Sequence, residues 1–144
     1  MDILPQLAEI LKDTQCSCVI LSHGETLVCR RRGVLDLYFF VNSDSDVLRD
    51  SAVADKVVGK GAAALLVIGG ATAVYANLIS EPALQMLRDN NVNVQYGTLV
   101  PHILNRDRSG YCPLETACMP YATAQECMPT IKAFVTQILN KPKP

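Results

Sequence analysis

A nearly continuous apolar stretch in the middle of the chain, residues 57–76, constrains the fold more than any other feature. It approaches the length of about 20 apolar residues that a membrane-spanning helix needs. Lys60 and the Gly69-Gly70 pair interrupt it, however, and this favours a buried helix followed by a buried strand. Apolar residues make up 49% of the chain and charged residues 19%, a balance that fits a core covered on both sides.

The length and charge of the chain limit its class. Its 144 residues are the size of one domain, residues 1–144, and can bury about two thirds of the unfolded surface. A formal net charge of -1 provides no general attraction for nucleic acid or membrane, so we expect neither as a partner. The amino terminus lacks the basic start and apolar run of a secretory signal, so we expect a soluble protein of the reducing cytoplasm whose six cysteines are thiols.

Hydrophobic periodicity and turn signals predict an alternation of helices and strands. The expected order is helix 3–13, strands 18–22 and 26–30 around a turn at 23–25, helix 34–41, helix 52–68 with Ser51 as its N-cap, strand 73–79, helix 80–91, strand 92–99, a short helix from Cys112 and helix 124–139. Strands joined through helices require right-handed crossovers, and the hairpin adds antiparallel pairing. The sequence therefore predicts an α/β fold, a three-layer α-β-α sandwich with a mixed sheet.

Three separated blocks carry a resemblance to a known superfamily. They are residues 51–60 (SAVADKVVGK), residues 79–84 (ISEPAL) and residues 99–115, the last with Leu-Val-Pro, Asn-Arg and Gly-Tyr-Cys-Pro-Leu-Glu. In these blocks and in its element order the chain resembles the cytidine-deaminase-like superfamily, in a branch of uncharacterised bacterial proteins. The resemblance runs from about Cys18 to the last helix. It implies a cytidine-deaminase-like fold in which the segment after Ser51 lines the pocket.

Zinc deaminases bind their metal through a helix-starting H-x-E and a later P-C-x-x-C motif. The chain contains His23-Gly24-Glu25, but in a predicted hairpin turn, which cannot aim both side chains as a helix start does. No P-C-x-x-C occurs in the sequence. The sequence therefore predicts a zinc-free domain, with no metal site and no resident cofactor.

Lys56 and Lys60 form the most informative pair of charges. On the predicted helix they lie one turn apart, where like charges repel, and the positions three and four residues away include no acid. A basic pair in this arrangement indicates an anionic partner, and an anion near Ser51 would also meet free backbone amides. The alternative is that both lysines pair with acids elsewhere in the fold or face water.

Two further residues are candidates for catalysis. Asp55 could act as a base or bind a ligand hydroxyl, and the alternative is an acid favoured by the helix dipole. Cys112 starts a C-P-L-E sequence that has the form of a capping box, where a thiol can become nucleophilic. The alternative is a small buried cap, since His102 could act as its base only through the fold.

These observations lead to one main hypothesis and two alternatives. The main hypothesis is a zinc-free deaminase-like domain that binds a small anionic ligand, such as a nucleotide, at a pocket formed by Ser51, Lys56, Lys60, Ser80, Glu81, Arg106, Cys112 and Glu115. Arg30, Arg31 and Arg32 could join Arg106 around a phosphate, or could be a solvated strand end. The first alternative is a transferase or hydrolase that uses Cys112 or Asp55. The second is a non-catalytic regulatory homo-oligomer, which the apolar composition permits.

Overall fold

The computed structural model describes residues 2–31, 34–43, 45–105 and 107–140. Its helices and strands, in chain order, are α1 (Leu4–Thr14), β1 (Cys18–Ser22), β2 (Glu25–Cys29), α2 (Leu35–Asn42), β3 (Ala52–Val58), α3 (Lys60–Gly69), β4 (Ala73–Ser80), α4 (Glu81–Asp89), β5 (Asn93–Val100), α5 (Pro113–Cys118) and α6 (Ala124–Asn140). In this part of the chain, no helix is long and apolar enough to cross a bilayer.

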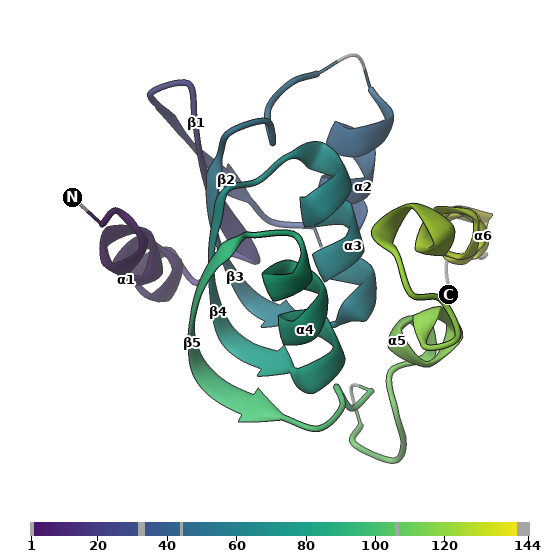
Figure 1. Cartoon of the computed structure of the whole chain (residues 1–144). Coiled ribbons are helices and arrows are strands. Elements are labelled where there is room, and N and C mark those ends of the chain that lie inside the picture. Colours follow the sequence, from purple (N-terminus) through teal and green to yellow (C-terminus); the bar gives the residue numbers. More distant parts are fainter. Residues whose placement is uncertain (1, 32–33, 44, 106, 141–144) are drawn as a thin grey trace.

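The five strands form one mixed sheet in the order β2-β1-β3-β4-β5. Strand β1 runs antiparallel to both β2 and β3, whereas β3, β4 and β5 are parallel. The two crossovers between parallel strands pass through α3 and α4, which lie on the same side of the sheet (Figure 1). Helix α1 covers the other side, and α5 and α6 lie beyond α3. The predicted mixed sheet with helices on both sides is confirmed.

One predicted element is wrong, because residues 52–58 form strand β3 and the helix begins only at Lys60. Three valines in this segment favour an extended backbone. Gly59 separates the two elements as the extended N-cap of α3, with φ -93° and ψ -178°. Ser51 is therefore not a helix cap. It precedes β3, and its hydroxyl donates to the carbonyl of Leu48 at 2.7 Å.

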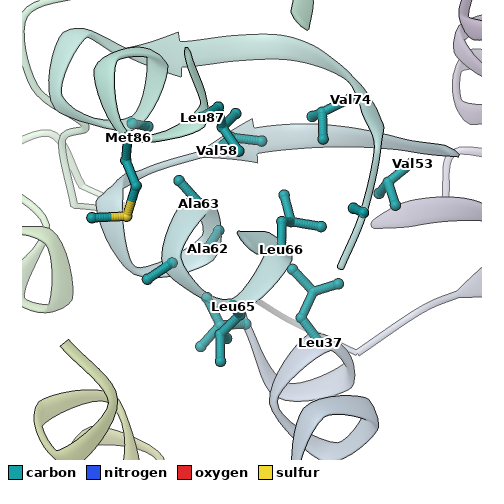
Figure 2. Close-up of a cluster of buried hydrophobic side chains, with 14 of the residues drawn as sticks. Leu37, Val53, Val58, Ala62, Ala63, Leu65, Leu66, Val74, Met86 and Leu87 are labelled. Atoms are coloured by element: carbon teal, nitrogen blue, oxygen red, sulfur yellow. The ribbon is translucent and has the colours of Figure 1, made fainter. Parts of the chain in front are cut away.

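Helix α3 forms the centre of the main core. Its residues 60–66 are all buried, and it contacts α2, α4, α5 and α6 as well as β3. Figure 2 shows side chains from α3 meeting those from the strands and from α2 and α4 on one side of the sheet. The labelled residues are Leu37, Val53, Val58, Ala62, Ala63, Leu65, Leu66, Val74, Met86 and Leu87. A smaller core around Leu4, Leu7 and Leu11 joins α1 to the opposite side.

A glycine lets α5 approach α3 closely. A Cβ atom at Gly61 would lie 2.6 Å from Cδ2 and 2.8 Å from Cγ of the buried Leu114. Both distances are shorter than a real contact allows, so any larger residue at this position would force the Leu114 side chain to shift.

Gly61→Ala should therefore destabilise the protein by about 1–3 kcal/mol, although alanine favours a helix over glycine by about 1 kcal/mol. Urea unfolding measures the change. In a Leu114→Ala background the clash is gone, and the same substitution should cost nothing or stabilise. An equal cost in both backgrounds would show that the contact with Leu114 is not the cause.

Candidate functional site

The structure does not place Lys56 and Lys60 on one helical face. Lys56 lies on β3, is exposed, and its Nζ donates to the carbonyl of Gln15 at 3.4 Å. Lys60 is the first residue of α3 and only 8% exposed, and its Nζ donates to the carbonyls of Met119 at 3.1 Å and Tyr121 at 2.6 Å. The predicted pairing of the two lysines around an anion is wrong, because a strand end and a glycine separate them.

A protein carboxyl group already occupies the anion position at the start of α3. Glu115 of α5 is 2% exposed and accepts hydrogen bonds from the backbone N–H of Lys60 at 2.9 Å and of Ile103 at 2.7 Å. The Ser80 hydroxyl also donates to Glu115. Ser80 in turn caps α4 by accepting from the N–H of Ala83 at 3.3 Å. The structure thus brings Lys60, Ser80 and Glu115 together as a satisfied internal network.

The other described residues of the predicted pocket do not take part in this hydrogen-bond network. Ser51 lies just before β3 and Lys60 lies just after it. The two residues are therefore at opposite ends of a strand that spans roughly 20 Å. Glu81 is exposed on the first turn of α4. Cys112 is half-buried and its thiol makes no capping bond at the start of α5. Arg106 lies outside the described residues.

A second group of ionisable side chains lies in one row across the sheet. Cys29 of β2 is the register partner of Cys18 of β1, and Cys18 is the partner of Asp55 of β3. The three residues are 5%, 4% and 8% exposed. Both cysteines belong to the main core, on the side that α2 and α3 cover. We call this group the Cys29–Cys18–Asp55 row.

Burial and hydrogen bonding set the protonation states in this row. Burial raises the pKa of Asp55 from 3.8 to about 7, although backbone hydrogen bonds from Val57 and Lys56 act in the opposite direction. The Cys18 thiol donates a hydrogen bond to the Cys29 sulfur, which raises the pKa of Cys18 and lowers that of Cys29. Burial and the nearby Asp55 raise the pKa of Cys18 further. If one sulfur of the pair ionises, it is Cys29.

The sequence prediction missed the two cysteines because the expected hairpin was one residue out of register. A turn at 23–25 with a strand from residue 26 pairs Ser22 with Thr26, and so would pair Cys18 with Arg30. In the structure only His23 and Gly24 form the turn, with φ of 49° and 81°, and Ser22 pairs with Glu25. Positive φ at both turn residues is typical of a two-residue hairpin. This turn length was the signal that could have identified the cysteine pair.

The row opens at Cys29 onto a cavity of about 570 Å³. The cavity is lined by Leu27, Val28, Cys29, Arg30, Arg31, Asp36 and Phe40. Arg31 is held in place, since its backbone N–H donates to Asp36 at 3.0 Å and its Nε lies 3.7 Å from the same carboxylate. Its guanidinium also lies over the Phe39 ring, 4.9 Å from the centroid. Arg30 is exposed and forms no salt bridge with a described carboxylate.

Among the described residues, no three His, Cys, Asp or Glu side chains lie in a group that could hold a metal ion.

The fold and this site define an α/β domain in which the polar groups at the carboxyl ends of β3 and β4 are paired internally and a separate cavity lies beside β2. The chain belongs to the family described as Domain of unknown function (DUF1893), whose model matches residues 6–135. The chain matches no curated protein.

A solved structure has a similar fold. It is the crystal structure of a DUF1893 family protein from Thermotoga maritima, with a TM-score of 0.80 and 24% sequence identity. The similarity covers 90% of this chain and 87% of the Thermotoga chain. At this identity the comparison shows the shared fold alone.

Glu115→Gln should destabilise the protein by about 2–4 kcal/mol in urea unfolding. A glutamine amide group would face a backbone N–H in place of an acceptor oxygen and leave a buried donor without a partner. Glu81→Gln, on the exposed first turn of α4, is the matched control and should cost a few tenths of a kcal/mol. Equal effects of the two substitutions would contradict a structural role for Glu115.

Asp55 should make stability depend on pH in an unusual direction. Its folded pKa of about 7 exceeds its ordinary value of 3.8, so stability is fully present below about pH 4 and is lost as pH rises toward 7. The loss approaches about 4 kcal/mol at about 1.4 kcal/mol per pKa unit.

Asp55→Asn should abolish this loss, so the variant gains stability over the wild type between pH 4.5 and pH 8. Unfolding at several pH values measures the difference. Asp13→Asn, an exposed change at the end of α1, should leave the wild-type profile unchanged. Parallel profiles for Asp55→Asn and the wild type would rule out a raised pKa.

Proposed function

We propose that the chain is a zinc-free, deaminase-like domain that binds a small anionic ligand, such as a nucleotide, in the cavity beside Cys29. The observation that carries the proposal is the presence of Arg30 and Arg31 on one cavity of about 570 Å³, against a single carboxylate, Asp36. Cavities that hold small ligands measure about 300–1,000 Å³. A guanidinium group binds phosphate or carboxylate through paired N–H donors.

The internal network at the start of α3 supports this position over the one predicted from sequence. The Lys60 ammonium donates to two backbone carbonyls, and the Glu115 carboxylate accepts from the backbone N–H of Lys60 at the start of α3. A ligand anion there would have to displace a buried carboxyl group. The arginines beside β2 require no such displacement, because Arg30 is exposed and Arg31 is already positioned by Asp36 and Phe39.

The walls of the cavity fit the rest of a nucleotide. Leu27, Val28 and Phe40 supply apolar surface on the same cavity. An aromatic base can pack on such surface while its phosphate meets the arginines. The cavity therefore combines the two kinds of contact that a nucleotide requires.

Topology supports the deaminase-like part of the proposal. The chain has a hairpin at one edge, three parallel strands and two crossover helices on one face. This order of elements agrees with the one on which the sequence resemblance rests, except that residues 52–58 form strand β3. The sequence supplies no P-C-x-x-C motif, so the proposal includes no metal.

A second candidate is a non-catalytic regulatory homo-oligomer. Apolar side chains are exposed on the segment that crosses the carboxyl ends of the strands: Leu104, Tyr111, Met119 and Tyr121, of which Tyr111 is 62% exposed. The enzyme alternative has weaker support. Asp55 lies behind two cysteines in its row, and the His102 ring packs on Tyr111 with 4.9 Å between centroids.

Thermal unfolding with AMP, ATP and pyrophosphate as probes tests the proposal. At saturation, a bound nucleotide should raise the Tm of the wild type by about 2–6 °C. The double variant Arg30→Gln/Arg31→Gln should bind at least tenfold more weakly in calorimetric titration, a change of about 1.4 kcal/mol. Arg88→Gln removes an exposed arginine from α4 and should bind as the wild type does.

The absence of a shift with all three probes would contradict nucleotide binding. An equal loss of affinity in the Arg88→Gln control would contradict the position of the site beside Arg30 and Arg31. If light scattering then gave a mass of two or more chains, the regulatory homo-oligomer would be favoured instead.

A further inference from the structure

We propose that Cys18 and Cys29 are a redox site that forms a reversible disulfide by exchange with a low-molecular-weight disulfide entering the cavity beside Cys29. The inference does not depend on the anionic ligand, because it concerns the thiols of the protein alone. It rests on the pairing of the two strands and on access through the cavity.

Strand pairing places the two cysteines opposite each other on one face of the sheet. They are direct register partners on antiparallel strands, and both side chains lie in the main core. Opposite residues in such a pair have Cα atoms about 4.5–5.5 Å apart, within the range of about 4.4–6.8 Å that a disulfide spans. Closing the bond therefore requires no change in the pairing of the strands.

The two thiols differ in access and in acidity. Cys29 lines the cavity, whereas Cys18 lies one strand further into the sheet. The Cys18 thiol donates to the Cys29 sulfur and so lowers the pKa of Cys29, and burial and the charges of Asp36 and Asp55 act against this. Because the thiolate is the nucleophile, Cys29 is the attacking residue and Cys18 the resolving one.

The exchange balances without any further reactant. The Cys29 thiolate attacks one sulfur of the small disulfide, whose S–S bond breaks, and the first small thiolate leaves. The Cys18 sulfur then attacks the Cys29 sulfur of this mixed disulfide and expels the second small thiolate. The Cys18 proton passes to Asp55 or solvent and on to a leaving thiolate. Two cysteines are oxidised and one small disulfide is reduced to two thiols.

The chain contains a second cysteine pair that should not react. Cys118 and Cys127 are both 0% exposed, and neither lines the cavity beside Cys29. The Cys127 thiol donates to the carbonyl of Cys118 at 3.9 Å. Burial raises the pKa of both thiols, that of Cys118 to about 12. Cys118 and Cys127 also lie near each other, so this pair tests whether access through the cavity decides which cysteines react.

Folded, full-length protein is incubated with excess oxidised glutathione at pH 8, without nucleotide, and its remaining thiols are alkylated. Mass spectrometry should find two alkylation sites lost and a peptide link between Cys18 and Cys29, which dithiothreitol reverses. Cys18→Ala should stop at one glutathione on Cys29. Cys29→Ala should slow glutathione addition at residue 18 at least tenfold. Cys127→Ala should leave the Cys18–Cys29 link unchanged.

Alanine is used in these variants because it keeps a small apolar side chain in the core, and the Tm of each variant checks its folding. Retention of both alkylation sites in the folded wild type would overturn the proposal. A link between Cys118 and Cys127 at an equal rate would do the same, since access would then not matter. Nucleotide binding is measured on reduced protein, so either proposal can fail while the other holds.

Discussion

The structure depends on the burial of α3. Residues 60–66 are buried between the sheet and four other helices, so the backbone N–H and the ammonium group of Lys60 are almost entirely removed from water. A buried polar group without a partner costs several kcal/mol, and these groups must therefore be satisfied by protein. Glu115 and the carbonyls of Met119 and Tyr121 satisfy them. The segment that carries these partners is thereby fixed across the carboxyl ends of the parallel strands.

Because of this arrangement, the candidate binding site does not lie at the carboxyl ends of the parallel strands. In open α/β sheets, ligands generally bind outside the carboxyl ends of the strands. Here Glu115 and Ser80 fill that position with an internal hydrogen bond. The cavity lies instead beside β2, at the edge of the sheet, where exposed arginines and the buried thiol of Cys29 line it. Behind it, the sheet pairs two thiols with a carboxyl group whose pKa burial raises to about 7.

Local patterns predicted most elements correctly. The apolar spacing of residues 4–11 gave α1, and Ser80-Glu81-Pro82 gave the capped start of α4. The error at 52–68 arose because Val53, Val57 and Gly61 also satisfy helical spacing, although β-branched residues and two glycines opposed it. The hairpin slip of one residue had a larger effect on the site, since it exchanged Cys29 for Arg30 as the partner of Cys18.

The sequence by itself determined the α/β class, the mixed sheet, the central buried helix and the lack of a zinc-deaminase motif, because these depend on periodicity, turns and residue order along the chain. Only the tertiary structure decided which charged side chains already have partners within the protein and which do not. Lys60 is bound by carbonyls about 60 residues further along the chain. Cys29, Cys18 and Asp55 meet through strand register. The physical reason is that burial, and pairing beyond the hairpin, are set by contacts between distant segments, which local patterns do not encode.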